Sequence, residues 1–238
     1  MIFQNFGFNR QKVTAAAGPT FNYVAGAYAI YDFGNTSSYA GTGATVYDVS
    51  GNGRNATLIN SPTYSSANGG IMDFTRASSQ YMTYTGVIGA AVTTMAIIKS
   101  KDTPNWVGFS GYPTARFTNG MIFFMLDGEA VDLPYYYSGA SGPTSINSIA
   151  WTGLTINVFN AYTFSMSNTT QKNYYNNSVK TSTLSLSRSD SASSTIRVAT
   201  ADGGTDFLNG YVMGYLHYNF QLTDAQVAQN VAVFSSRY

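Results

Sequence analysis

The segment from residue 44 to residue 74 constrains the fold of this 238-residue chain more than any other. An apolar start at residues 46–47 leads directly into a polar turn of sequence DVSGNG at residues 48–53. A second short apolar run covers residues 56–59, and a third covers residues 71–74 after a loop that ends in Asn-Gly-Gly. Short apolar runs separated by Gly and Asn turns are typical of antiparallel sheets. This segment therefore predicts strands at the rim of an antiparallel sandwich.

The rest of the chain continues the pattern of short strands and tight turns. Residues 92–99 alternate in a way that favours a strand, and the apolar run 121–126 is flanked by Asn-Gly and Asp-Gly, two hairpin-turn dipeptides. Only 10% of the residues are charged, whereas Gly and Tyr are plentiful, at 23 and 19 residues. About a dozen strand candidates without a repeat period or a charged linker predict one all-β domain, a two-sheet antiparallel sandwich over residues 23–238.

One helix signal lies near the C-terminus of the sequence. Thr223 is a good N-cap residue, and Asp224 suits the positive end of the helix dipole. Val227, Val231 and Phe234 follow at helical spacing. A short C-terminal helix with one apolar face is therefore expected to pack on the sandwich.

Composition excludes several classes of function. Because the chain has no cysteine, it can form neither a disulfide framework nor a thiolate metal site, and it suits a reducing compartment. The net charge is +1 and no basic run occurs, so the sequence predicts neither nucleic-acid nor membrane binding. No leader-like segment and no membrane-length apolar run is present, and export by a standard signal peptide is not expected.

The N-terminal segment, residues 1–22, differs from the rest. Phe3, Phe6 and Phe8 alternate with polar and small residues, and an Ala/Gly/Pro spacer follows them. One interpretation is an arm that docks to a partner protein through these aromatic residues. The alternative, held at even odds, is a first strand or a strap across the domain's own core.

Several motifs together resemble the laminin G-like branch of the concanavalin A-like lectin/glucanase superfamily. They occupy residues 31–36, 38–39, 46–58, 63–65, 68–74, 207–210, 218–219 and 222–223. The resemblance implies a jelly roll of two antiparallel sheets, one convex and one concave. Two departures stand out: Phe74-Thr75-Arg76 replaces a usual Phe-Asp-Gly, and Met213-Gly214 replaces an acidic pair in the last strand. Both argue against metal or ligand chemistry that relies on those carboxylates.

Glycoside hydrolysis is disfavoured by the distribution of acidic residues. The reaction needs two carboxylates facing each other about 5 to 9 Å apart. Glu129 is the one glutamate, and Asp127 and Asp132 lie near it, but Asp127-Gly128 is itself a turn signal. An acidic hairpin tip is the simpler interpretation. His217 is the one histidine, and it lies in an aromatic strand, where a packed residue is expected rather than a catalyst.

Calcium is the one metal that the sequence suggests, and no other cofactor is expected. Asp48 and Asn52 carry hard oxygen donors in the DVSGNG turn, and the laminin G-like resemblance implies a calcium site at the sandwich rim. The same two side chains are what a turn uses to bond its own backbone. We favour this second interpretation, in which they stabilise the turn.

A sugar-binding surface is predicted from aromatic residues in loop-like segments. The candidates are Trp106, Tyr112, Tyr135, Tyr136 and Tyr137. Their rings could stack on sugar faces, although consecutive tyrosines on a strand alternate between faces, so at most two of the three can share one. A protein–protein interface uses the same residue types and is an equal alternative.

These observations favour a non-enzymatic bacteriophage virion structural protein, a capsid decoration or fibre-type component made in the host cytoplasm. Similar stand-alone jelly rolls occur in phage structural proteins, and the aromatic arm and the composition fit that class. Other virion proteins and surface glycans are the expected partners, and a homo-oligomer, with a trimer as the favoured form, is the expected assembly. The alternative is a bacterial carbohydrate-binding lectin module, and a glycoside hydrolase is the third, disfavoured hypothesis.

Overall fold

A computed structural model describes most of the chain. It covers residues 21–102, 107–108, 121–122, 125–127, 130–132, 135–136, 151–152, 155–183, 194–200 and 207–238. Within residues 103–154, and at Ser194, the description is limited to the backbone. The structural statements that follow concern these residues.

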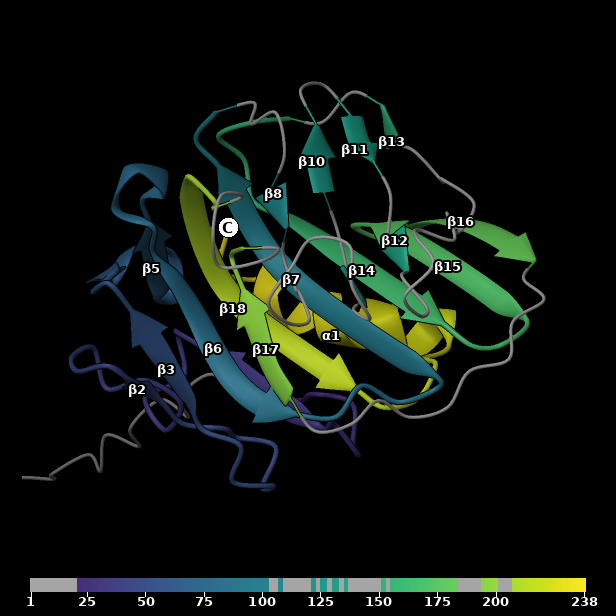
Figure 1. Cartoon of the computed structure of the whole chain (residues 1–238), viewed down its shortest axis with the longest axis horizontal. Coiled ribbons are helices and arrows are strands. Elements are labelled where there is room, and N and C mark those ends of the chain that lie inside the picture. Colours follow the sequence, from purple (N-terminus) through teal and green to yellow (C-terminus); the bar gives the residue numbers. More distant parts are fainter. Residues whose placement is uncertain are drawn as a thin grey trace, which may run out of the picture.

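The larger sheet has eight antiparallel strands in the order β16-β15-β14-β7-β18-β5-β4, with β1 also paired to β18 (Figure 1). Its strands are β1 (Ala29–Asp32), β4 (Thr63–Ser65), β5 (Ile71–Phe74), β7 (Val92–Ser100), β14 (Asn160–Met166), β15 (Thr170–Tyr175), β16 (Ser178–Thr183) and β18 (Gly210–Tyr218). Strand β18 is central: β7 lies along one side, and β5 and β1 share the other. A bulge between Val212 and Gly214 shifts the register with β7.

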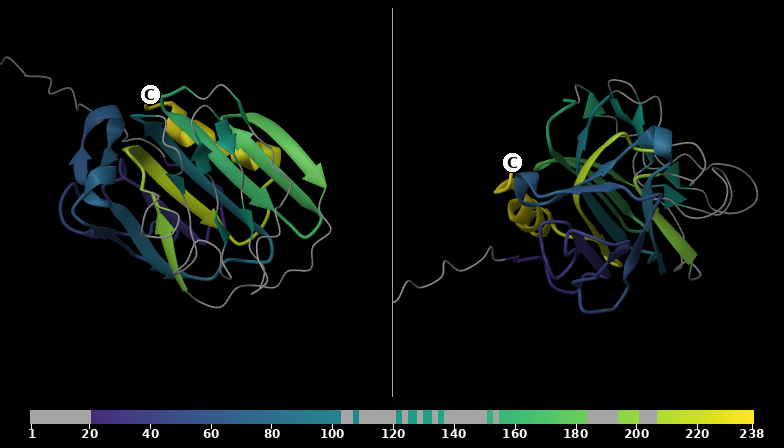
Figure 2. Two further views of the ribbon diagram at one scale, coloured as in Figure 1. Left: turned by 45° about the horizontal axis from the view of Figure 1, so that its top comes forward. Right: turned by 90° about the vertical axis from the view of Figure 1, so that its left-hand side faces the viewer.

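The second sheet has four antiparallel strands in the order β17-β6-β3-β2. These are β2 (Thr45–Val46), β3 (Ala56–Ile59), β6 (Tyr81–Gly86) and β17 (Ser194–Val198). Buried aromatic and apolar residues from both sheets form one core, among them Tyr31, Phe74, Met82, Phe164 and Tyr215. Figure 2 shows the layers from two further sides. The predicted two-sheet antiparallel sandwich is confirmed.

Shorter elements complete the described backbone. One small sheet joins β8 (Val107–Gly108), β10 (Met125–Asp127), β11 (Ala130–Asp132) and β13 (Trp151–Thr152), and another joins β9 (Met121–Ile122) and β12 (Tyr135–Tyr136). Two 3-10 helices, η1 (Ala67–Gly69) and η2 (Arg76–Ser78), flank β5.

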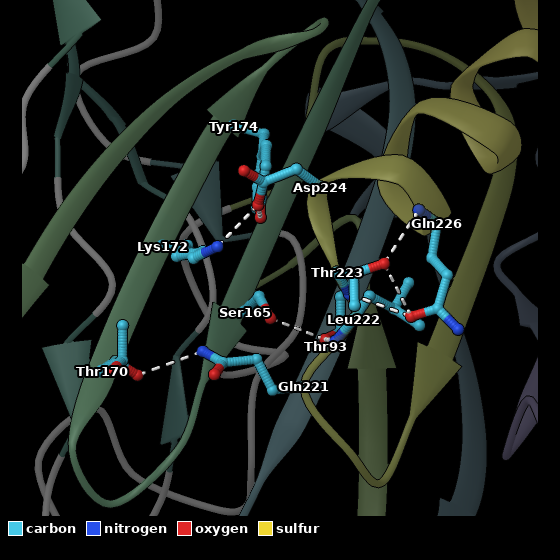
Figure 3. A network of polar contacts seen from close by, with 10 residues as sticks. All are labelled: Thr93, Ser165, Thr170, Lys172, Tyr174, Gln221, Leu222, Thr223, Asp224 and Gln226. Carbon is cyan, nitrogen blue, oxygen red and sulfur yellow. Dashed lines mark hydrogen bonds and ion pairs between the residues drawn. The ribbon is translucent and has the colours of Figure 1, made fainter.

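Helix α1 (Asp224–Ser235) covers the face of the large sheet that points away from the second sheet. It begins with a full capping box, in which Thr223 accepts a hydrogen bond from the Gln226 N–H and the Gln226 side chain accepts one from the Thr223 N–H (Figure 3). The Asp224 carboxylate accepts from Lys172 Nζ at 2.6 Å and from the Tyr174 hydroxyl at 2.7 Å, which fixes the start of the helix to β15. The predicted C-terminal helix and its cap are confirmed. Among the described residues, no helix has the length and apolar character needed to cross a membrane.

An ion pair next to the C-terminus joins the helix to the end of β1. Arg237 donates to both carboxylate oxygens of Asp32, at 2.8 and 3.1 Å, and Asp32 is fully buried. The Tyr23 hydroxyl donates to the same carboxylate at 2.6 Å. A Cβ atom at Gly34 would lie 1.8 Å from Arg237 Nη1 and 2.1 Å from the Gly69 carbonyl oxygen. Glycine is therefore required at residue 34, because the main-chain carbonyl of Gly69 leaves no room for a Cβ atom.

Candidate functional site

A pocket of about 460 Å³ lies between the loop that follows β1 and the turn that joins β3 to β4. It is lined by Tyr39, Gly41, Thr42, Gly43, Ala44, Leu58, Ser61, Pro62 and Tyr64. Tyr39, Leu58 and Pro62 are buried, whereas Thr42 and Ser61 are exposed, so the pocket has a buried apolar part and a polar rim. Its volume lies within the range of about 300–1,000 Å³ that small-molecule sites occupy.

Two tyrosine rings form the aromatic part of the pocket. The ring centroids of Tyr39 and Tyr64 lie 5.4 Å apart, and the ring planes are inclined by 56°. The Tyr39 ring makes an edge contact with the Phe33 ring, with 5.8 Å between the ring centroids. The Tyr39 hydroxyl donates to the Gly43 carbonyl oxygen at 2.8 Å. Burial raises the pKa of Tyr39 above its ordinary value, so the phenol is neutral at physiological pH. The two rings therefore offer fixed, uncharged faces at an angle to each other.

The turn on the other side of the pocket has an uncommon backbone conformation. Asn60 and Ser61 both lie in the left-handed region, with φ of 59° and 52°, which few non-glycine residues adopt. The buried Gln80 side chain donates to the carbonyl oxygens of both residues at 3.0 Å and accepts from the Thr75 N–H at 2.7 Å. These bonds hold the turn in place and fix how Ser61 and Pro62 face the pocket.

The glycine-rich loop of the pocket is also held at both ends. Gly41 has φ of +91°, a conformation that favours glycine. A Cβ atom there would also lie 3.3 Å from the Tyr64 ring, which is a close contact. At the far end, the Leu58 N–H donates to the Ala44 carbonyl oxygen at 2.7 Å. The pocket is therefore formed before any ligand arrives.

The chemical character of the pocket is neutral and amphipathic. None of the nine described residues that line it carries a charge at neutral pH. The hydroxyls of Thr42, Ser61 and Tyr64 can each donate and accept a hydrogen bond, and the ring faces and Pro62 provide apolar contact. This arrangement can bind a small polar molecule with an apolar face, and it supplies no carboxylate or imidazole for acid–base catalysis.

The predicted rim residues Asp48 and Asn52 stabilise the turn that contains them. Both oxygens of the Asp48 carboxylate accept hydrogen bonds, from the N–H groups of Ile30, Ser50 and Arg54 at 2.9 to 3.0 Å and from the Ser50 hydroxyl at 2.8 Å. The Asn52 amide donates to main-chain carbonyls just before β1. These contacts favour the turn interpretation, and the calcium site stays a prediction. Within the described part of the chain, no cluster of three His, Cys, Asp or Glu side chains could hold a metal ion.

The other predicted site residues fall largely outside the described side chains. The backbone of Tyr135 and Tyr136 forms β12 and pairs with Ile122 and Met121 of β9. The remaining predicted residues lie outside the described residues: Trp106, Tyr112 and Tyr137 for the ligand, Phe3, Phe6 and Phe8 for the partner, and Glu129 among the acids.

His217 is a packed residue between the two sheets. It is 1% exposed, and its Nδ1 lies 2.8 Å from the Tyr84 hydroxyl of the opposite sheet. Burial lowers its pKa to about 3, with a smaller opposing effect from a hydrogen bond to Asn219 and a further lowering by the nearby Arg54 charge. The imidazole is therefore neutral.

Sequence reasoning missed Tyr39 and Tyr64 as site residues. Both belong to motifs of the resemblance, and each borders a segment rich in Gly, Ser or Thr. Aromatic residues beside such loops are a usable signal for a ligand site. What the sequence does not show is that these two rings meet across the rim.

Comparisons with known proteins agree with this fold. No protein-family model matches the chain, and the search of curated proteins finds no match. Among solved structures, the botulinum neurotoxin type G receptor-binding domain is similar, with a TM-score of 0.66 and 10% identity over 88% of this chain and 51% of that one. Trypanosoma rangeli sialidase in complex with the inhibitor DANA is also similar, with a TM-score of 0.60 and 12% identity. The match covers 87% of this chain and 33% of the sialidase.

A third similar structure has nearly the same extent as this chain. Domain 4 of AbnA, a GH43 extracellular arabinanase from Geobacillus stearothermophilus, was solved in complex with arabinotriose. It gives a TM-score of 0.54 and 16% identity over 87% of this chain and 98% of that one. By contrast, the chain spans about half the length of the botulinum domain. At these identities the likeness shows the fold, and the fold is a jelly roll.

Proposed function

We propose that this chain is a non-enzymatic carbohydrate-binding jelly-roll domain that a bacteriophage virion displays as a capsid decoration or fibre-type component. The observation that carries the binding part is the preformed pocket between Tyr39 and Tyr64, with its neutral hydroxyl groups. A sugar ring has an apolar face and a hydroxyl-bearing edge. Tyrosine rings and Ser and Thr hydroxyls complement both at once.

A structural neighbour supports the carbohydrate part of the proposal. Domain 4 of the arabinanase was solved with arabinotriose, and this chain matches 98% of its length. A domain of this fold and extent therefore accommodates a sugar in that protein. For the present chain we propose a carbohydrate ligand, without proposing that it is arabinotriose.

The non-enzymatic part is supported by the contacts of the acidic residues. Of the 11 acids in the chain, five have described side chains, and an internal partner engages each one. These are Asp32 with Arg237, Asp48 with its turn, Asp73 with Lys101, Asp102 with Arg76, and Asp224 with Lys172. Glycoside hydrolysis requires two carboxylates that face each other across the substrate, and the described part of the pocket lining contains no acid.

A glycan array tests the binding. The labelled wild-type chain should bind a defined set of glycans, and Tyr64→Ala should weaken that binding by about fivefold or more, because an aromatic contact of this kind contributes about 1 kcal/mol or more. Tyr47→Ala is the matched control, since Tyr47 is 52% exposed and does not line the pocket. A blank array at high protein concentration contradicts the proposal. So does release of sugar from a bound glycan on incubation, which indicates an enzyme.

The virion part is supported by composition and by the aromatic N-terminal segment. Residues 22–24 already contact the helix, since the Asn22 carbonyl accepts from Gln229 and the Val24 N–H donates to Asn230. A deletion that ends at residue 20 therefore leaves these contacts intact.

The same deletion tests the attachment. The shortened chain should keep its melting temperature but be absent from purified phage particles, as measured by mass spectrometry. Particles that carry the shortened chain at the normal level contradict the docking arm.

A further inference from the structure

The lining of the pocket also indicates which sugars it accepts. We infer that it selects uncharged sugar units and discriminates against acidic ones such as uronic acids. This inference rests on the proposed carbohydrate binding, and it assigns the substrate class of that same pocket.

The first step of the argument is the absence of any compensating charge. Tyr39, Leu58 and Pro62 are buried, and none of the nine described residues that line the pocket is Lys, Arg or His. A carboxylate that enters a partly desolvated pocket loses hydration, and a cation or a full set of hydrogen-bond donors is needed to restore that loss. Here it would meet a few hydroxyl donors and ring faces, and no cation among the described lining residues. Because the faces of tyrosine rings are negative, they would not attract an anion either.

The second step is the fit to a neutral ligand. The rim hydroxyls of Thr42 and Ser61 form no hydrogen bond with any described residue, so both are available to a ligand. Hydroxyl groups both donate and accept, as sugar hydroxyls do, and they can therefore pair without an uncompensated charge. The turn at Ser61 is already held by Gln80, so binding costs little ordering.

The third step is that a cationic patch among the described residues lies away from the pocket. On the outer face of the large sheet, the ammonium groups of Lys99 and Lys101 lie 4.7 and 4.5 Å from the centroid of the Tyr211 ring. Lys101 is paired with Asp73 at 2.5 Å, whereas among the described residues Lys99 Nζ has only the aromatic rings of Tyr211 and Phe159 as partners. An acidic glycan would be attracted to this cationic patch, which shares no residue with the pocket.

The test uses matched sugar pairs that differ only in one carboxylate, such as galactose and galacturonic acid at the end of the same glycan. Calorimetry should give a Kd at least about tenfold lower for the neutral member, since the unpaired carboxylate is not compensated. Changing NaCl from about 50 to about 500 mM should alter the neutral Kd by less than about twofold, because no charge is involved.

The outcomes are distinguishable. If the acidic member binds as tightly as the neutral one or more tightly, and Tyr64→Ala abolishes this binding, the inference is overturned. The proposed carbohydrate binding is then unaffected. Alternatively, the acidic member binds in a way that Lys99→Ala abolishes and Tyr64→Ala does not affect. This result locates the acidic ligand at the cationic patch and supports the inference. Binding to neither member of any pair overturns the proposed function and the inference with it.

A charge introduced at the rim gives a second, positive test. Thr42→Lys brings an ammonium group to the pocket, and we expect it to tighten binding of the acidic member by about fivefold or more relative to the neutral one. Thr57→Lys is the matched control, because Thr57 is equally exposed on the neighbouring strand but does not line the pocket. An unchanged ratio in Thr42→Lys, with binding retained, contradicts the assignment.

Discussion

The polar groups around strand β1 and those of the tyrosine pocket differ in what they contact. At β1, the Asp32 carboxylate is occupied by Arg237, Tyr23 and the Gly34 N–H, and the Asp48 carboxylate is occupied by donors of its own turn and by the Ile30 N–H. In the pocket, the hydroxyls of Thr42, Ser61 and Tyr64 have no hydrogen-bond partner among the described residues.

This difference separates polar residues that stabilise the fold from polar residues that can bind a ligand. Most buried polar groups in folded proteins are satisfied internally, and the Asp32 and Asp48 carboxylates near β1 both accept hydrogen bonds from the protein. Groups at an open rim can leave their hydrogen bonds to water until a ligand replaces it. It follows that mutations near β1 should reduce stability, whereas mutations at the rim should reduce binding alone.

The largest expected effect is that of Arg237→Ala. The change leaves the buried Asp32 carboxylate without its cation, and removing one partner of a buried pair typically costs about 3–5 kcal/mol in the free energy of unfolding. Urea denaturation measures this loss. Ser235→Ala, at the end of α1, is the control nearby in the sequence, because Ser235 is exposed and should change stability by less than about 0.5 kcal/mol. Equal values for the two variants would show that the ion pair does not stabilise β1.

The next effect is a pH dependence of stability from His217. Burial lowers its pKa from 6.5 to about 3, so below pH 6.5 the unfolded chain binds a proton that the folded chain does not. His217 therefore reduces stability as pH falls from about 6.5 towards 3, by about 1.4 kcal/mol per pH unit. Comparing urea denaturation of wild type and His217→Gln at several pH values isolates this slope from that of the carboxylates. Parallel pH profiles would mean that the folded protein protonates His217 normally.

A smaller loss is expected for Asp48→Ala. The N–H groups of Ile30, Ser50 and Arg54 lose their acceptor, which should cost about 1–3 kcal/mol. Asp48→Asn, which keeps one acceptor oxygen, should lose less. Calcium should not raise the melting temperature of the wild type, because both carboxylate oxygens already accept hydrogen bonds. A rise that Asp48→Asn abolishes would instead support the calcium site predicted from the sequence.

The smallest expected effect on stability belongs to the pocket rim. Thr42→Ala removes an exposed hydroxyl without an internal partner, so the free energy of unfolding should change by less than about 0.5 kcal/mol. Glycan binding should nevertheless weaken measurably in the same variant. A loss of stability without a loss of binding would reverse the roles that we assign to the two regions.

Local sequence patterns predicted the parts of the fold that depend on local interactions. The turn at residues 48–53, the strand at residues 71–74 and the Thr223 cap are all present, because turn chemistry and capping act over a few residues. Strand β4 (Thr63–Ser65) differs from the expectation, because it lies within the segment that was expected to be the loop ending in Asn-Gly-Gly.

The pocket could not be predicted, for a physical reason. The approach of the Tyr39 and Tyr64 rings depends on the left-handed turn at Asn60 and Ser61 and on the Gln80 side chain that supports it. These contacts join residues that are distant in sequence, and the periodicity of apolar residues carries no information about such contacts. The aromatic residues chosen from the sequence were the conspicuous tyrosine run, whereas the pocket uses single tyrosines beside glycine-rich loops.

An NMR titration tests the central claim most directly. Adding the neutral glycan that binds best on the array to ¹⁵N-labelled protein should shift the amide signals of residues 39–44 and 58–64 and leave those of β7 and β18 in place. Shifts that instead cluster around Lys99 and Tyr211, with the pocket amides unchanged, would contradict the assignment of the binding site.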